Sequence, residues 1–189
     1  RAQFRAPLRN VLGILPGSGG TERLPRVIPV HEAARMIILG DPIPAEKARE
    51  FGLVDEIVTG DLLEAGIAYA QKLVAEGKGP RRVRDLPPKV EGDQKALLEA
   101  VPAQAAKSAG GNPAPAEIAK CIQAAVTLPF DEGRKVERER FEYLVNTVES
   151  KALRHMFFAE RQATKIPDVP EDTPTREIRK AAVIGSGTM

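Results

Sequence analysis

The stretch LGILPGSGGTERLPR, residues 12–26, decides how the rest of the chain is interpreted. An apolar segment ends at Pro16, a glycine-rich turn follows, and Thr21 opens a segment compatible with a helix. This order predicts a turn that exposes successive backbone N–H groups around Gly17 to Gly20, where they can hold an anion, a carbonyl oxygen or a water molecule. Taken alone, the same pattern is more often a plain tight turn.

On the C-terminal side of this turn the sequence predicts short helices. Apolar residues at i, i+3, i+4 and i+7 from Val30 form one helical face, and Gly40 ends that helix. A second helix is expected between Pro44 and Gly52, and a third with its apolar side at 63–74. Between these two helices, LVDEIV (53–58) predicts a short strand or extended segment.

The second half of the chain follows a connector of mixed Gly, Pro and charge at 77–93. Residues 94–165 are predicted to be helical, with an interruption near Pro102 and a break at Pro129. Residues 166–177, IPDVPEDTPTRE, hold three prolines and four acids and predict an extended interdomain linker. The apolar faces expected on these helices comprise Ile118, Cys121, Ile122 and Ala125, then Phe141, Leu144, Val145 and Val148, then Leu153, Met156 and Phe157.

Composition excludes several classes of protein. A net charge of +2 argues against a dedicated nucleic-acid binder. The locally basic residues at 78–84 are interpreted as a solvated connector, with phosphate contact as the alternative. The chain has one cysteine, which suits a reducing compartment, and no apolar run approaches the roughly 20 residues of a membrane span.

Four longer segments carry a resemblance to known proteins. LGILPGSGGTERLPR and AARMIILGDPIPAEKAREFGLVDEIV (33–58) resemble the second half of the crotonase (enoyl-CoA hydratase/isomerase) family, and residues 114–144 resemble that family's C-terminal helices. KALRHMFFAERQATKIP (151–167) resembles the linker helix of bifunctional enoyl-CoA hydratase/3-hydroxyacyl-CoA dehydrogenases of fatty acid β-oxidation. The resemblance implies the C-terminal part of a crotonase-like α/β fold, so this chain should be mainly α with a few short strands.

The resemblance also implies a chemistry. In the family, trans-2-enoyl-CoA is hydrated by a water held between two Glu carboxylates, while two backbone N–H groups polarise the thioester carbonyl. The first Glu and the oxyanion glycines would lie before Arg1, and the second would fall at position 9, which is Arg9. Residues 1–21 contain no Asp or Glu. Of this site the resemblance leaves Gly17, whose backbone N–H is expected to touch the catalytic water.

The last residues, AAVIGSGTM (181–189), resemble the opening of an NAD-binding domain. Gly185 and Gly187 match the first two glycines of the dinucleotide fingerprint. The third glycine, the helix and the ribose-binding acid are not in this sequence, so NAD is expected to bind the parent protein and not this chain alone. The chain is thereby interpreted as a segment of a longer protein.

Isolated reactive side chains are given structural interpretations. His31 and His155 have no second ligand at metal spacing and are expected at the surface or in helix packing. Cys121 is interpreted as a buried inert thiol. The acids of the 137–142 segment are interpreted as a solvated, salt-bridged face comprising Glu137, Glu139 and Glu142. Phe141 is expected in the core, with a role in lining an acyl pocket as the alternative.

These observations give one interpretation and two rivals. The domains expected are a partial hydratase domain at 1–76, the connector, the helices of 94–165, the linker and a first Rossmann strand with its turn at 178–189. The parent would act on acyl-CoA with NAD in the cytoplasm, and the isolated chain would be inactive and marginally stable, with a disordered tail after about residue 166. The rivals are a single-activity enoyl-CoA isomerase and a non-catalytic assembly protein that self-associates through the helix faces at 30–37 and 118–125.

Overall fold

The computed structural model of the chain describes residues 3–4, 12–108, 110–163, 165–166, 169–170, 172–182 and 184–185. These residues are mainly helical with two very short strands, which confirms the expected class. In chain order the elements are β1 (Gln3–Phe4), α2 (Gly20–Val27), α3 (Val30–Leu39), β2 (Ile43–Pro44), α4 (Ala45–Phe51), α5 (Leu62–Ala75), the 3₁₀ turn η1 (Val83–Asp85), α6 (Gln94–Ser108), α7 (Ala114–Thr127), α8 (Phe130–Asn146) and α9 (Val148–Ala163).

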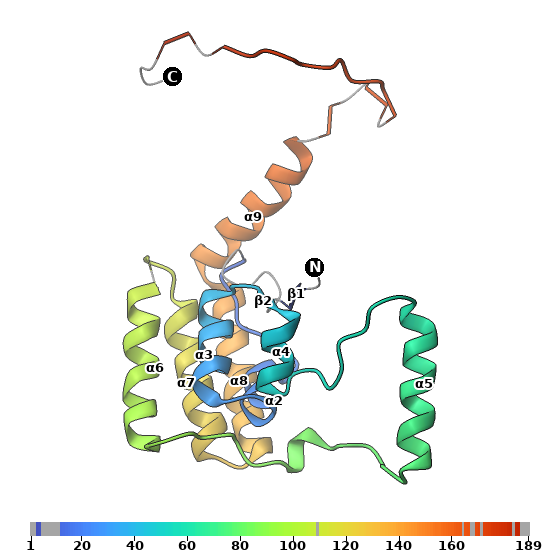
Figure 1. The fold of residues 1–189 in the computed structure, drawn as a ribbon. Coiled ribbons are helices and arrows are strands. Elements are labelled where there is room, and N and C mark those ends of the chain that lie inside the picture. Colours follow the sequence, from blue (N-terminus) through green and yellow to red (C-terminus); the bar gives the residue numbers. More distant parts are fainter. Residues whose placement is uncertain are drawn as a thin grey trace.

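Helix α7 is the centre of a helical bundle. It contacts α2, α3, α6 and α8, which surround it (Figure 1). Its Ile118 and Ile122 are fully buried, as the apolar spacing predicts. The main core is built almost entirely from aliphatic residues: Leu15, Val30, Ala34, Ile37, Ile38, Val101, Ala105, Ala114, Ile118, Ala119, Cys121, Ile122 and Leu144.

A second, smaller core joins α4 to α2 and α3. Antiparallel β2 and β1 pair beside it, with Gln3 opposite Pro44 and Phe4 opposite Ile43. Helices α3 and α4 both end where a glycine takes a left-handed conformation, at Gly40 (φ 73°) and Gly52 (φ 83°), as predicted. The buried members of this core are Ile28, Ala33, Met36, Ile43 and Ala48.

One local prediction was wrong, and another lost one of its two alternatives. Residues 53–58 form no strand, which leaves the extended segment as the prediction for them: the N–H groups of Leu53 and Val54 both donate to the carbonyl of Ala48 and close the end of α4. Helix α6 runs through Pro102 without interruption. Val101 and Ala105 are both buried in the main core, and their packing holds the two turns together although proline removes a helical hydrogen bond.

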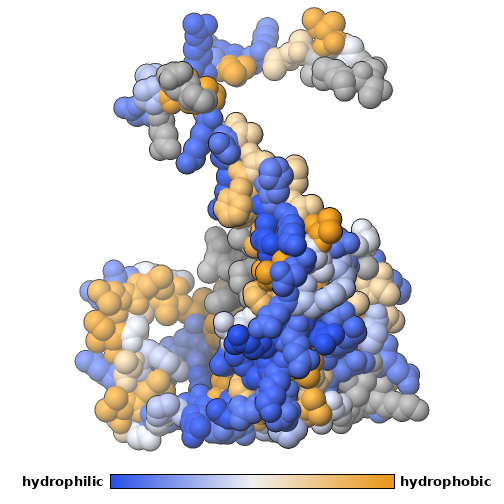
Figure 2. All heavy atoms as spheres, turned by 180° about the vertical axis from the view of Figure 1, so that it is seen from behind, coloured by the Kyte–Doolittle hydropathy of each residue, from blue (hydrophilic) through white to orange (hydrophobic). Residues whose placement is uncertain are grey.

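Helix α5 stands apart from the bundle, joined to it by long connectors on both sides (Figure 1). The helix forms where the apolar spacing predicts, and the side chain of Asp61 caps it by accepting from the N–H groups of Leu63 and Glu64. None of its residues is buried. Figure 2 shows its apolar atoms as a patch on the molecular surface.

Helix α9 packs against α8 at its beginning and then extends away from the bundle (Figure 1). The described residues after it, including 172–182 and 184–185, lie in neither helix nor strand. Residue 183 and residues 186–189 lie outside the described ranges, so the strand and turn expected at 178–189 stay a prediction. Within those ranges we find no helix with the length and apolar character that crossing a bilayer requires.

Candidate functional site

The glycine-rich turn between Pro16 and α2 is the centre of the candidate site. Ser18 (φ 62°) and Gly19 (φ 91°) both adopt left-handed backbone conformations. That conformation is ordinary for glycine, whereas for serine it costs about 1 kcal/mol. The guanidinium of Arg23 donates to the carbonyl of Ser18 and helps hold this shape. The turn therefore has a specific backbone conformation that is held by a hydrogen bond.

The turn holds an anion, and that anion belongs to the chain itself. Oε1 of Glu137, on α8, accepts from the backbone N–H of Gly19 at 2.6 Å. Its Oε2 accepts from the backbone N–H of Thr21 at 3.0 Å and from the Thr21 hydroxyl at 2.6 Å. Arg134 adds a fourth hydrogen bond, at 2.7 Å to Oε1. The predicted anion-holding N–H groups thus receive a carboxylate from more than 110 residues further along the chain.

The interpretation of Glu137 as part of a solvated face was wrong. The residue is 1% exposed, whereas Glu139 and Glu142 lie at the surface in ion pairs with Arg140 and Arg138, as predicted. The missed signal is the spacing of Gly133 and Glu137. They sit four residues apart, on the face that also carries Phe141 and Leu144, so a carboxylate interrupts an otherwise small or apolar stripe.

A second buried acid lies directly beneath the turn. Glu22, in the first turn of α2, has no exposed surface and forms an ion pair with Arg26 at 3.0 Å. Its other oxygen, Oε1, is buried without a hydrogen-bond partner. Burial raises the pKa of Glu22 from 4.5 to about 7, against the opposing effect of Arg26 and with a smaller contribution from the charge of Glu137. Sequence reasoning did not single this residue out.

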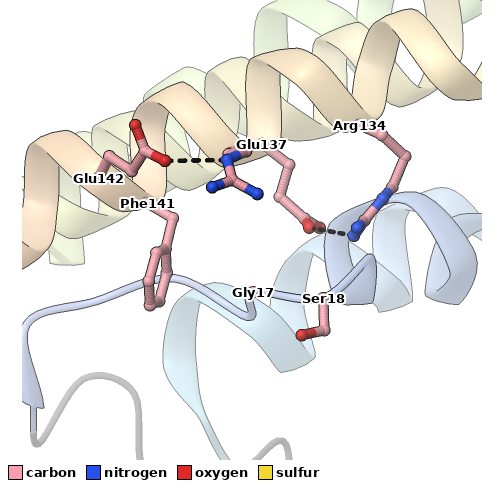
Figure 3. Close-up of a pocket in the computed structure, with 7 residues that line it drawn as sticks. Gly17, Ser18, Arg134, Glu137, Phe141 and Glu142 are labelled. Atoms are coloured by element: carbon pink, nitrogen blue, oxygen red, sulfur yellow. Dashed lines mark hydrogen bonds and ion pairs between the residues drawn. The ribbon is translucent and has the colours of Figure 1, made fainter.

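A cavity of about 280 Å³ opens between the turn and α8. Figure 3 shows Arg134, Glu137 and Phe141 projecting from α8 toward the loop that carries Gly17 and Ser18. The remaining lining residues are Arg138 and Glu142, which pair with each other. A Cβ on Gly17 would stand 3.3 Å from the ring of Phe141, so the bare backbone faces the ring. Phe141 packs against the main core and also lines this cavity, and its role in lining an acyl pocket stays a prediction.

The predicted role of Gly17 stays a prediction. In the structure its N–H donates to the carbonyl of Leu15 at 2.9 Å. The preceding segment is anchored by Ser150 of α9, whose hydroxyl donates to the carbonyl of Leu12 at 2.9 Å. Arg9, which stands where the resemblance expects a catalytic Glu, lies outside the described residues.

The other predicted residues lie away from this cavity. Gly185 is exposed, and a Cβ built on it would meet no atom within 4 Å. Gly187 lies outside the described residues. His31 and His155 are exposed, and the described residues contain no group of three or more potential metal ligands. Cys121 is fully buried, and burial, with smaller effects from nearby carboxylates, raises the pKa of its thiol to about 12. The predicted burial of this thiol is confirmed, and its lack of reactivity stays a prediction.

Comparison with known proteins matches residues 1–86 to the enoyl-CoA hydratase/isomerase family. This region contains the glycine-rich turn, α2, α3 and α4. Over residues 1–86 the chain is therefore similar to the enoyl-CoA hydratase/isomerase family. The family resemblance carried by the Pro-Gly and Gly-Gly-Thr motifs is thereby confirmed.

Similar proteins extend this result beyond the family region. The chain is 38% identical over 186 residues to the peroxisomal bifunctional enzyme of Danio rerio. It is 34% identical over 182 residues to the peroxisomal bifunctional enzyme of Cavia porcellus and to the fatty acid oxidation complex subunit alpha of Shewanella sp. (strain MR-4). Each comparison includes 94% of this chain, and the chain spans about a quarter of the length of these relatives. The similarity therefore runs through α6–α9 as well as through the enoyl-CoA hydratase/isomerase region.

Proposed function

We propose that this chain is a segment of a bifunctional enzyme that hydrates trans-2-enoyl-CoA and oxidises the resulting 3-hydroxyacyl-CoA with NAD in fatty acid β-oxidation. The observation that carries the proposal is the extent of similarity: relatives named as bifunctional enzymes or fatty acid oxidation subunits are similar over 94% of the chain, past the end of the hydratase/isomerase region at residue 86. A single-activity isomerase would not account for similarity across α9 and the segment after it.

In this proposal the glycine-rich turn and α8 form one wall of the hydratase site. Hydration adds water across the double bond next to a thioester, and the negative charge that develops on the carbonyl oxygen must be stabilised by donors. The cavity at Gly17 and Phe141 offers a backbone turn on one side and an apolar ring on the other. This pairing suits a site where a polar reacting group continues into an acyl chain.

The two buried acids beside the turn do not supply the acid–base pair that hydration needs. Glu22 is enclosed in an ion pair with Arg26, and all the hydrogen bonds of Glu137 serve the turn and Arg134. Residues 1–21 contain no carboxylate side chain. Loss of one acid–base group lowers rates by about 10² to 10⁴. We therefore propose that the chain alone does not hydrate enoyl-CoA.

The described residues do not fit NAD either. A dinucleotide site needs a strand, a glycine turn and a helix whose N-terminus meets the pyrophosphate. Gly185 lies in exposed irregular backbone, and the described part of the chain has no helix after α9. We assign no step to NAD in this chain, and oxidation belongs to the proposal for the parent protein alone. A cytoplasmic location also stays a proposal, because two relatives carry names that place them in the peroxisome.

Two assays on two proteins test this proposal. Crotonyl-CoA is added and loss of the enoyl absorbance is followed; separately, 3-hydroxybutyryl-CoA and NAD are added and NADH is followed. Neither signal is expected from the purified chain, and both are expected from a longer native product that contains this sequence, identified by its intact mass in the source cells. Turnover by the chain alone would contradict the proposed inactivity. A longer product without hydratase turnover would contradict the proposed function.

The exposed apolar side chains of α5 favour non-catalytic assembly as the alternative function. The faces at 30–37 and 118–125 pack against each other inside the main core, so self-association through them stays a prediction without a contact to support it. Four exposed apolar side chains gather on α5 instead, at Leu62, Leu63, Ile67 and Val74. Size-exclusion chromatography of the chain separates the cases: a defined oligomer supports assembly, and a monomer contradicts it.

A further inference from the structure

We propose that Glu137 is a positioning residue, whose buried carboxylate fixes the glycine-rich turn in the shape that faces the cavity. The proposal rests on the proposed function, because it concerns the wall of the hydratase site. Glu137 lies on α8, a different element from the turn, and binds the turn through three hydrogen bonds.

The carboxylate of Glu137 binds the turn at more than one point. Its two oxygens divide the turn between them, with Oε1 on the N–H of Gly19 and Oε2 on the N–H and hydroxyl of Thr21. Two acceptors on one rigid group fix both the position and the orientation of the three-residue segment that joins the turn to α2. A side chain with a single acceptor would leave one of these buried N–H groups without a partner.

The turn requires an uncommon backbone conformation. Ser18 and Gly19 are left-handed in succession, and a serine does not adopt that conformation without outside support. The carboxylate is bonded to the residues on both sides of Gly20, so it favours this arrangement over the extended conformations that the segment would otherwise sample. The N–H groups of Gly19 and Thr21 converge on the same carboxylate, which explains why an anion is the matching partner.

The turn also faces the cavity. Phe141 follows Glu137 by one helical turn and faces the bare backbone of Gly17. Helix α8 thus influences both sides of the cavity: Phe141 supplies the ring on one side, and Glu137 fixes how far the turn on the other side lies from that ring (Figure 3). A shift of the turn by about 1 Å would change the site's geometry, and misplacement of that size can lower turnover about 10²-fold.

The buried charge of Glu137 is balanced in place. Arg134 lies 2.7 Å from Oε1, and the N-terminal end of α2 presents its N–H groups to the same carboxylate. The charge therefore interacts mainly with the turn and Arg134. Removing it should destabilise the turn more than it destabilises the helical bundle.

The test uses two substitutions and one control. Glu137→Gln keeps the shape and one acceptor oxygen but presents an NH₂ group to one half of the turn, whereas Glu137→Ala removes both acceptors. Glu139→Ala is the matched control, because Glu139 lies two positions further along α8 and is exposed. Amide hydrogen exchange, read residue by residue by NMR on the chain, reports on the turn without any need for enzymatic activity.

In Glu137→Gln we expect exchange at Gly19 or Thr21 to rise by about tenfold or more, while the amide of Ile122 in α7 changes less than about twofold. Glu137→Ala is expected to raise both. Unchanged exchange at Gly19 and Thr21 in the Gln variant would overturn the proposal, and so would an equal rise at Ile122, which would indicate a general structural role.

The same substitutions in the longer product give the second readout. We expect kcat for crotonyl-CoA hydration to fall by about tenfold or more in Glu137→Gln with KM changed much less, because the turn faces reacting atoms rather than the bulk of the ligand. A rise in KM with kcat unchanged would contradict the positioning role. If the unsubstituted product shows no hydratase activity, the proposed function fails, and the exchange measurement still decides whether Glu137 holds the turn.

Discussion

Gly133 lies directly against the carboxylate of Glu22: a Cβ built on Gly133 would stand 2.3 Å from Oε1 of Glu22 and 2.6 Å from its Cδ. The two residues come from different helices, α8 and α2, which cross at this point. Because Glu22 has no exposed surface and is paired with Arg26, its carboxylate has no open space to move into. The absence of a side chain at 133 is what lets the two helices approach.

The first prediction follows from this contact. Gly133→Ala should lower the free energy of unfolding by about 2 kcal/mol, as overpacking of a filled interior does, although alanine is the better helix former. Gly66→Ala in α5 is the matched control, because a Cβ there meets nothing within 4 Å. It should be neutral or should stabilise by up to about 1 kcal/mol. Urea unfolding followed by circular dichroism measures both, and equal effects at the two positions would contradict the packing argument.

The sequence predicts the local structure of this chain well wherever a helix carries its own signals. Gly40 and Gly52 end helices as expected, and the apolar spacing of α7 identified residues that are fully buried. For residues 53–58 only the strand alternative failed, because a short apolar run does not say whether a partner strand is available. Pro102 misled because tertiary packing on Val101 and Ala105 outweighs a lost hydrogen bond.

The candidate site was predictable only in part. The turn at 17–20 and its affinity for an anion follow from glycines before a helix, which is a local signal. The identity of the anion does not, because Glu137 lies 118 positions after Gly19 and its neighbours in sequence are exposed charges. Glu22 was missed for the same reason: a charged residue in a first helical turn ordinarily faces water, and only the crossing of α2 and α8 buries this one.

The second prediction concerns pH. The pKa of Glu22 is raised in the folded state to about 7, so below its ordinary value of 4.5 it is protonated in both states and its contribution is fully present. Between these values the unfolded chain releases the proton and the folded chain keeps it, so the free energy of unfolding falls with rising pH, by about 3 kcal/mol in total. Glu22→Gln should remove this fall, while Glu46→Gln, at an exposed site, should keep it. Denaturant titrations at a series of pH values test this, and a slope shared by all three proteins would contradict it.

The third prediction concerns Cys121. A thiol with a pKa of about 12 is almost entirely protonated near pH 8, and this one is also fully buried. We expect its reaction with Ellman's reagent to be at least about 10³-fold slower in the folded chain than in urea, because the thiolate is the reacting species. The chain has no other cysteine, so the signal belongs to this residue alone. Labelling at the rate of the denatured chain under folding conditions would show that the core around α7 opens readily.

The fourth prediction concerns α5. This helix has no buried residue, and the described structure stabilises it through its own hydrogen bonds, the cap by Asp61 and an exposed ion pair between Lys72 and Glu56. An isolated helix of about this length is marginal in water, so its amides should exchange orders of magnitude faster than those of α7. Asp61→Ala should raise exchange within α5 further, consistent with about 1 kcal/mol for a lost N-cap, and should leave the unfolding midpoint of the bundle unchanged. Protection of α5 equal to that of α7 would contradict this, and would mean that the exposed leucines at 62 and 63 are covered in solution by another surface.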